Sequence, residues 1–169
     1  MKSTLKLLIL YFFVIQLSAC GGKEEKKEEF NYGRKAPVET PKEIKATTND
    51  VSASKRIDLE NKGVGPITSL ELQDEIDQAM ATTGAEVFKN KCTACHRADK
   101  KFIGPAPTGI MSRRSPEWIM NMILNPEEMV KNDPLAKDLL IEFNGSPMAN
   151  QNLTQEEARA VLEYFRTLK

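Results

Sequence analysis

Scarce residue types limit what this sequence can do. Its 169 residues include one histidine, one tryptophan and three cysteines, and they contain no internal repeat that we can find. A structural zinc site needs about four ligands, so a site of Cys and His would require nearly every thiol and imidazole of the chain. Charge of neither sign dominates, because 24 Lys and Arg residues are balanced by 24 Asp and Glu residues, which gives no support to nucleic-acid binding. The length suits one ordinary domain with an additional segment.

The N-terminus carries an apolar run that is too short to span a bilayer. Two lysines precede a largely apolar run of eleven residues, 7–17, whereas a transmembrane helix needs about 20. This layout predicts a secretory signal peptide over residues 1–19, and an uncleaved membrane anchor is the alternative. The sequence LSAC at residues 17–20 resembles a bacterial lipobox, which implies cleavage before Cys20 and a diacylglyceryl group on its sulfur. We therefore expect a lipoprotein of the bacterial cell envelope, anchored on the periplasmic side or at the outer membrane.

The composition then changes to that of a flexible tether. Residues 20–62 are rich in Lys, Glu, Thr, Ser and Pro and contain few large apolar side chains, so they cannot bury enough surface to order themselves. A linker of this length has a root-mean-square reach of about 35 Å, which would let a globular head search near a membrane. Residues 63–80 are expected to form an extended strap and a helical turn. The strap would pack on the domain that follows, residues 81–169.

The start of that domain has the pattern of a helix. Thr83 and Glu86 have the spacing of a capping box, and the apolar residues after them recur at helical intervals. We expect a helix that begins here and runs into the cysteine motif. No segment of the domain has a convincing strand pattern, so the predicted fold class is all-α.

Further helix starts follow the cysteine motif. At residues 115–116, 125–126 and 133–134 a capping residue precedes a proline, and proline fits the first position of a helix. Three short helices are expected, of which the last stops near residues 144–145, Asn-Gly. Thr154 and Glu157 form a second capping box before an apolar stripe that predicts the C-terminal helix.

The lone histidine directly follows a Cys-x-x-Cys pair, and this spacing is typical of covalent haem attachment. Cys92, Cys95 and His96 form the sequence CTACH. Two intervening residues in a helical turn let the sulfurs reach two edges of one porphyrin, and the next residue presents its imidazole to the iron. We predict one covalent haem c, bound through thioethers to Cys92 and Cys95, with His96 as an iron ligand.

Three other uses of the cysteine pair are weighed against haem. A zinc site would find no further Cys or His in the folded part of the chain. A thioredoxin-like dithiol is expected in a βαβ context, which an all-α domain does not supply, and a structural disulfide is the remaining alternative. The cysteine count favours haem, because one lipid attachment and two thioethers account for all three sulfurs.

From about Gly84 to the C-terminus, the sequence resembles class I cytochrome c, a family of small helical electron carriers with one haem. Gly84 and Phe88 precede the motif as in the family's N-terminal helix, where they pack against an aromatic residue of the C-terminal helix, here Tyr164 or Phe165. The resemblance also implies that the carbonyl of Pro105, in the sequence FIGPAP, accepts a hydrogen bond from the haem-ligating histidine. Taken alone, a Gly-Pro pair is more often an ordinary turn.

The second axial ligand of the iron is predicted to be Met148. Because His96 is the only histidine, two histidines of one chain cannot bind the same iron. Met148 lies in a loop just before the C-terminal helix, and the family has its axial methionine in a corresponding loop. Pro147 stiffens the approach of this thioether. The alternative is that Met148 only packs at the start of the helix, whereas the methionines within predicted helices are expected to fill the core.

Two further features concern the surroundings of the haem. Trp118 is expected either to contact a haem propionate as a hydrogen-bond donor, as in related cytochromes, or to fill the core. Residues 89–114 contain seven basic residues and one acidic residue, whereas residues 115–169 contain five basic and nine acidic ones. A positive rim beside the haem edge would steer an acidic redox partner, and an ordinary solvated face is the alternative.

These patterns predict a single-electron carrier and not an enzyme. His/Met ligation closes both axial positions, so the iron exchanges an electron without binding a substrate. The expected redox partners are a membrane quinol-oxidising complex and a terminal reductase or oxidase outside the cytoplasm. Residues 63–66 and 115–129 also resemble cytochromes that accompany bacterial nitrous-oxide reductase. The alternative function is a haem enzyme or sensor, for instance peroxidase-like, with an open or labile sixth coordination position.

Overall fold

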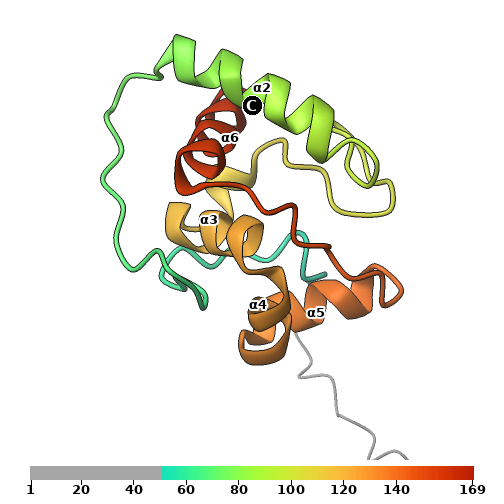
Figure 1. Cartoon of the computed structure of the whole chain (residues 1–169). Helices are drawn as coiled ribbons and strands as arrows, with labels where there is room; N and C mark the ends of the chain where they lie inside the picture. The colour runs from blue at the N-terminus through green and yellow to red at the C-terminus, as the bar shows by residue number, and fades with distance from the viewer. Residues whose placement is uncertain (1–50) are drawn as a thin grey trace, which may run out of the picture. The chain divides into compact units, whose positions relative to one another are not determined.

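The described α-helices form two groups: one pair that crosses, and three shorter helices beside this pair (Figure 1). The computed structural model describes residues 51–169, so the predicted signal peptide, Cys20 and most of the predicted tether lie outside the described residues. Within residues 51–169 the β structure is limited to one isolated bridge, between Asp58 and Arg114. The all-α prediction is confirmed. Over the same range, no helix is both long and apolar enough to cross a bilayer.

Helix α2 (Gln78–Lys91) crosses helix α6 (Gln155–Thr167), and this crossing joins the two ends of the predicted domain. Gly84 permits the close approach, because a Cβ at this position would overlap the carbonyl oxygen of Ala160. Phe88 lies beside both predicted aromatic partners, with ring centroids 5.5 Å from Tyr164 and 5.7 Å from Phe165. The predicted packing between these helices is therefore observed.

The three predicted proline-initiated helices are present. They are α3 (Pro116–Leu124), α4 (Pro126–Asn132) and α5 (Pro134–Glu142). The hydroxyl of Ser115 accepts a hydrogen bond from the Trp118 amide, and the Asp133 carboxylate accepts one from the Ala136 amide at 2.7 Å. These side chains satisfy amides that a helix start leaves without partners. A short 3₁₀ turn, η2 (Ile110–Ser112), leads into α3.

The ends of α5 and the start of α6 also follow the sequence signals. After α5, Asn144 and Gly145 adopt φ angles of 58° and 71°, the left-handed conformation that ends many helices. Thr154 and Glu157 form the reciprocal capping box at the start of α6. Between them lies an extended segment, residues 146–153, that carries Met148.

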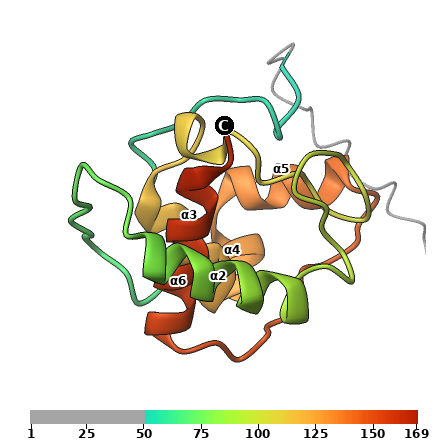
Figure 2. The ribbon, with the colours of Figure 1, turned by 90° about the horizontal axis from the view of Figure 1, so that it is seen from above.

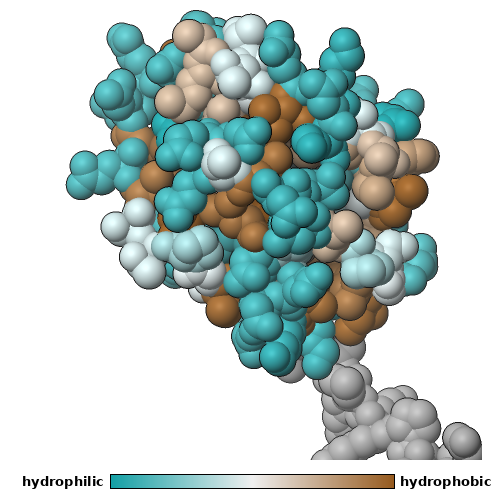
Figure 3. Space-filling view, viewed as in Figure 1, coloured by the Kyte–Doolittle hydropathy of each residue, from teal (hydrophilic) through white to brown (hydrophobic). Residues whose placement is uncertain are grey.

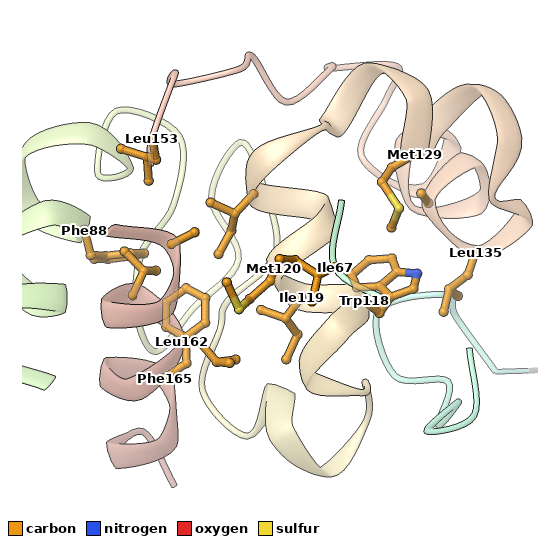
Figure 4. Close-up of a cluster of buried hydrophobic side chains, with 14 of the residues drawn as sticks. Ile67, Phe88, Trp118, Ile119, Met120, Met129, Leu135, Leu153, Leu162 and Phe165 are labelled. Carbon is orange, nitrogen blue, oxygen red and sulfur yellow. The ribbon is translucent and has the colours of Figure 1, made fainter. Parts of the chain in front are cut away.

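One hydrophobic core runs from the α2–α6 crossing to α4 and α5. Figure 4 shows Phe88, Leu162 and Phe165 at one end, Ile119 and Met120 in the middle, and Trp118, Met129 and Leu135 at the other end. Helix α3 supplies the central side chains, and Met120 and Met129 are almost fully buried, as predicted for methionines within helices. The core thus holds the two helical groups in fixed positions.

The helix before the cysteine motif begins earlier than predicted. Its N-cap is Asp77, whose carboxylate accepts a hydrogen bond from the Met80 amide at 2.9 Å. Thr83 lies inside the helix, where its hydroxyl donates to the Ala79 carbonyl, so the predicted capping box at Thr83 and Glu86 is wrong. The physical reason is tertiary, because the Asp77 amide is held by the buried carboxylate of Glu163 at 2.9 Å. The predicted boundary between residues 80 and 81 therefore falls within α2.

The first described residues, 51–62, were predicted to belong to the flexible tether, but they pack against the helices. Ala53 is 5% exposed and belongs to the hydrophobic core. The Asn61 amide donates to the Asp133 carboxylate at 2.6 Å. The polar composition of this stretch led to the wrong prediction, because its contacts with the helices are themselves largely polar. We call residues 51–77 the N-terminal segment; it passes along α5, α3 and α6 before α2 begins (Figures 1 and 2).

Candidate haem site

The cysteine motif continues the last turn of α2. Cys92 is the C-cap of the helix, and its carbonyl accepts hydrogen bonds from the amides of Cys95 at 3.1 Å and His96 at 2.9 Å. The chain therefore makes one further helical turn through the motif. As a result, Cys92, Cys95 and His96 line the same cavity, as the spacing predicts for two thioethers and one iron ligand.

The imidazole of His96 is fixed by the turn that follows it. Its Nδ1 lies 2.8 Å from the carbonyl oxygen of Pro105. A carbonyl can only accept, so Nδ1 carries the proton and the lone pair of Nε2 is free to bind a metal. The predicted contact between His96 and Pro105 is observed. Such a partner orients a ligating histidine and increases its basicity.

Gly104 allows the backbone to pass beneath this imidazole. A Cβ at residue 104 would lie 2.5 Å from Cε1 of His96, closer than side chains approach one another. The Gly104 amide also donates to the Cys95 carbonyl at 2.9 Å, which closes the loop back onto the cysteine motif. The sequence FIGPAP therefore supplies both a hydrogen-bond acceptor and the room for the ring.

The cavity is large and mostly apolar. Its empty space, part of which opens to solvent, measures about 1120 Å³. Its walls come from all five described α-helices, from η2 and from the loops between them. The aliphatic and aromatic lining includes Phe88, Ile103, Ile110, Ile119, Ile123, Val130, Leu139, Leu140, Phe143 and Phe165. A flat hydrophobic group the size of a porphyrin fits these walls chemically.

Two methionines line this cavity. Met148 does so from the extended segment after α5, together with Pro147 and Ser146. Met122 does so from α3, although sequence reasoning placed it in the core. Met148 is half-buried, and its thioether can approach the cavity from a different part of the chain than the cysteine motif does. The structure thus brings His96 and the predicted second ligand to one cavity.

The environment of Cys92 disfavours the dithiol alternative. Burial raises the pKa of the Cys92 thiol to about 11. A redox-active dithiol needs the opposite shift, because the thiolate is the nucleophile. The zinc alternative also lacks support, since residues 51–169 contain no group of three His, Cys, Asp or Glu side chains able to hold a metal ion. A buried, neutral sulfur in an apolar wall is compatible with a thioether.

Sequence reasoning treated two cavity-lining arginines only as part of a basic stretch. Arg113 donates to the carbonyls of Gly109 at 2.9 Å and Thr108 at 3.1 Å, and Arg114 is 3% exposed. Burial lowers the pKa of both guanidinium groups, and in Arg114 the charge of Arg113 adds to this effect. Within residues 51–169 neither arginine forms an ion pair with a carboxylate. One half-buried and one buried cation in the wall of an apolar cavity suit a ligand that carries carboxylates, as haem does in its propionates.

Trp118 lines the cavity but does not offer its N–H to a ligand. The indole is 3% exposed, and Nε1 donates to the Asp133 carboxylate at 3.1 Å. Of the two alternatives for Trp118, its place in the hydrophobic core is observed, and Asp133 already occupies the N–H that a propionate would need. Trp118 contributes the face of its ring, and the guanidinium of Arg114 lies 5.3 Å from the ring centroid.

The fold and the cavity define a class of helical proteins that bind one covalent haem. Residues 81–169 match the family model described as cytochrome c, and the chain belongs to the cytochrome c family. Members of this family bind haem c covalently, and Cys92 and Cys95 fit the attachment motif. The predicted family and cofactor are thereby confirmed, and the chain is a haem protein of the electron-carrier type.

Individual relatives agree with this assignment. Cytochrome c2 of Rhodopseudomonas palustris is 27% identical over 113 residues, covering 53% of this chain and 98% of that protein. Cytochrome c-551 of Pseudomonas denitrificans is 29% identical over 89 residues, covering 52% of this chain and all of that protein. Among solved structures, cytochrome c from Rhodothermus marinus is 44% identical with a TM-score of 0.60, covering 62% of this chain and 89% of that one. An engineered form of that protein bound to a carbene intermediate is 43% identical, with a TM-score of 0.57.

Proposed function

We propose that the protein is a lipid-anchored single-electron carrier in which His96 and Met148 are the axial ligands of one haem c. The observation that carries the proposal is that both side chains line one apolar cavity together with Cys92 and Cys95. When bound, the haem supplies the one-electron chemistry, and the chain determines how it is held and approached.

The residues around the cavity have separate tasks in this proposal. His96 presents Nε2 because Pro105 holds the proton on Nδ1. Met148 provides a thioether, a ligand that raises the reduction potential of cytochromes c. The apolar walls exclude water, which keeps the site in a low-dielectric environment and closes it to substrates. These tasks favour transfer of an electron over binding of a substrate.

The surface beside the cysteine motif is suited to an acidic redox partner. Phe102 and Ile103 are 46% and 45% exposed, and Ile103 also lines the cavity. The guanidinium of Arg97 lies 4.1 Å from the centroid of the Phe102 ring. The nearby cations form no ion pairs within the part of the chain that the structure describes; they are Lys89, Lys91, Arg97, Lys100 and Lys101. Apolar groups inside a ring of free positive charge allow both steering and close approach.

Apolar side chains also reach the surface elsewhere. In the view of Figure 3 they emerge between polar side chains over the middle of the molecule. This mixture of charged and apolar surface is ordinary for a soluble domain. The basic residues around Phe102 and Ile103 therefore distinguish the proposed docking surface more than its apolar content does.

The cellular setting of the proposal comes from sequence patterns. Cleavage before Cys20 and lipidation of its sulfur would hold the protein in the bacterial cell envelope, on the periplasmic side or at the outer membrane. There it would receive electrons from a membrane quinol-oxidising complex and deliver them to a terminal reductase or oxidase, with nitrous-oxide reductase as one candidate. Cys20 lies outside the described residues, so this part depends on the lipobox resemblance.

One experiment tests the ligation. The chain is produced with haem-maturation machinery, and visible spectra are recorded in the oxidised and reduced states. A low-spin spectrum with a methionine-to-iron charge-transfer band, and pigment that stays with the protein in denaturing electrophoresis, are expected. A protein without covalent pigment would contradict the whole proposal.

A second experiment tests the docking surface. Reversal of charge at Lys100 and Lys101, each to Glu, should slow electron transfer to an acidic acceptor protein at low ionic strength about tenfold or more. The matched control is the double change Lys131→Glu and Lys137→Glu, which reverses two charges at exposed α4 and α5 positions outside the cavity lining. Equal effects of the two changes would show that only net charge matters.

A haem enzyme or sensor with a labile sixth position is the second candidate. The observation in its favour is the engineered Rhodothermus marinus cytochrome c that is bound to a carbene intermediate, since that relative of this fold accepts a ligand. Exposure of the reduced wild-type protein to carbon monoxide separates the two candidates. Rapid, complete binding with a changed Soret band would favour the sensor, and no binding over hours would favour the carrier.

A further inference from the structure

The cofactor cavity has a wall residue from outside the cytochrome c part of the chain. The family model begins at residue 81, but Ser54 lines the cavity together with Arg113 and Arg114. The neighbouring Ala53 is buried in the hydrophobic core. Residues 53–56 therefore belong to the haem site in space, although they precede the matched domain in sequence.

Helix α5 holds these residues in place. The amide and the hydroxyl of Ser54 donate to the two carboxylate oxygens of Glu142, at 2.7 and 2.5 Å. The guanidinium of Arg56 pairs with the carboxylate of Asp138 at 2.7 Å. Asp138 and Glu142 are one helical turn apart, so residues 54–56 lie along α5, as Figures 1 and 2 both show for the start of the described chain.

The segment in turn holds the buried Arg114. Its Nη2 donates to the Ala53 carbonyl at 2.6 Å, and its Nη1 donates to the carbonyls of Arg56 and Arg113. Three of the five N–H donors of this guanidinium are thus used by backbone carbonyls, two of them from residues 53–56. Carbonyl groups fix its orientation without neutralising its charge. Over residues 51–169, no carboxylate lies within ion-pair distance of Arg114.

We infer that residues 53–56 are a positioning element that holds the charge of Arg114 at the haem cavity and thereby raises the reduction potential. This inference rests on the proposed function. Reduction adds one electron to the centre, and a fixed positive charge in a low-dielectric site favours the reduced state. The charged groups around Arg114 are Arg113 and Arg56, which act in the same direction, and Asp58 and Asp133, which oppose them. A loosened segment would let Arg114 turn towards solvent, where water screens its charge.

The test is a redox titration of the complete haem-loaded protein, followed by its visible spectrum. Arg114→Gln should lower the equilibrium constant for reduction about tenfold, which for one electron is ~59 mV. Glu142→Gln, which releases Ser54, should lower it about threefold. Removal of the negative charge of Glu142 would by itself raise the equilibrium constant for reduction. A fall of this constant in Glu142→Gln therefore shows that Arg114 has lost its position. In the double variant, Glu142→Gln should cause no further fall of this constant beyond that of Arg114→Gln, because the segment acts through Arg114.

The matched control breaks contacts of the N-terminal segment that do not lie at the cavity. Arg166 donates to the carbonyls of Gln73 and Asp74, at 2.6 and 3.1 Å, and does not line the cavity. Arg166→Gln should lower the Tm and leave the potential unchanged. If Arg166→Gln lowers the potential as Glu142→Gln does, both variants act by a general loosening of the fold, and the inference is wrong.

Two other outcomes would overturn the inference. The first is a reduction potential that is unchanged in Arg114→Gln. The second is a fall of the potential on Glu142→Gln that is as large in the Arg114→Gln background as in the wild type. If Arg114→Gln does not fold, Arg114→Lys replaces it: lysine keeps the charge but cannot reach both carbonyls, so a smaller fall is expected, and no fall contradicts the inference. Failure of the proposed function would look different, since no reversible one-electron reduction would then be seen in the wild type.

Discussion

The two sides of the haem cavity are held by the rest of the molecule in very different ways. On the histidine side, hydrogen bonds close the loop on itself, from the Gly104 amide to the Cys95 carbonyl and from the Thr108 amide to the Ala98 carbonyl. On the methionine side, one hydrogen bond ties residues 147–152 to another described element, from the Asn150 amide to the Leu124 carbonyl at 3.3 Å. The contrast indicates that the proposed ligand His96 is held more firmly than the proposed ligand Met148.

This difference has a chemical consequence for the proposed carrier. An imidazole held by Pro105 keeps its orientation, so its contribution to the electronic properties of the site stays constant. A thioether on a loosely tied segment can leave and return at low cost. The two candidate functions, carrier and ligand-binding protein, therefore differ mainly in how well the methionine side stays closed.

The largest expected effect is on the histidine side. His96→Ala removes the imidazole that faces the cavity and should abolish the low-spin spectrum and reversible reduction. The cysteines remain, so the pigment can still be attached. Visible spectroscopy and denaturing electrophoresis together measure the two properties. A low-spin spectrum in this variant would show that the proposed ligand is not His96.

The next effect is on the methionine side. Met148→Ala should keep the covalent haem, lose the charge-transfer band, lower the reduction potential and allow carbon monoxide to bind to the reduced protein. Met122→Leu is the matched control, because Met122 also lines the cavity. It should keep the band. If Met122→Leu loses the charge-transfer band and Met148→Ala keeps it, the iron ligand is Met122 and not Met148.

Glycines on the two sides give a comparison of stability. Gly104→Ala places a methyl group 2.5 Å from His96 Cε1 and should reduce the free energy of unfolding by ~1–3 kcal/mol. Gly145→Ala meets no atom within 4 Å and has only its φ of 71° against it, so a loss of ~1 kcal/mol is expected. Denaturant unfolding followed at the Soret band measures both. A larger loss at Gly145 would contradict the proposed difference in rigidity.

The smallest effect concerns the one hydrogen bond of the methionine side. Asn150→Ala should change the free energy of unfolding by less than ~1 kcal/mol, because the donor is exposed. It should nevertheless speed the binding of carbon monoxide to the reduced protein. Stopped-flow mixing measures this rate, and an unchanged rate would show that Asn150 does not help to close the segment.

The sequence was sufficient for the parts of the fold that depend on local signals. Proline at a first helical position and a reciprocal capping box act within one turn of the chain, and all three proline-initiated helices and α6 were predicted with their starts. The motif CTACH and the contact between His96 and Pro105 also depend on short spacing. These features need no knowledge of distant residues.

Features that depend on distant residues were not predictable. The start of α2 at Asp77 is set by Glu163 from the other end of the domain, and this carboxylate also binds Arg159 and Arg166. The order of residues 51–62 depends on partners such as Glu142 and Asp133, which are 72 or more residues away. The sequence left open whether Trp118 contacts a propionate or fills the core, because the partner of its indole N–H, Asp133, is 15 residues away. Polar contacts between distant segments leave no periodic pattern in a sequence.

The crossing of α2 and α6 at Gly84 also bears on the order in which the protein is assembled. Helix α6 follows all the other described helices in the chain, so α2 lacks this contact until α6 has been synthesised. Until then the wall formed by Val161 and Phe165 is missing, and the two thiols of the attachment motif are accessible from that side. The last of the described helices thus closes the cavity, so a porphyrin can be joined to the chain before α6 seals the site.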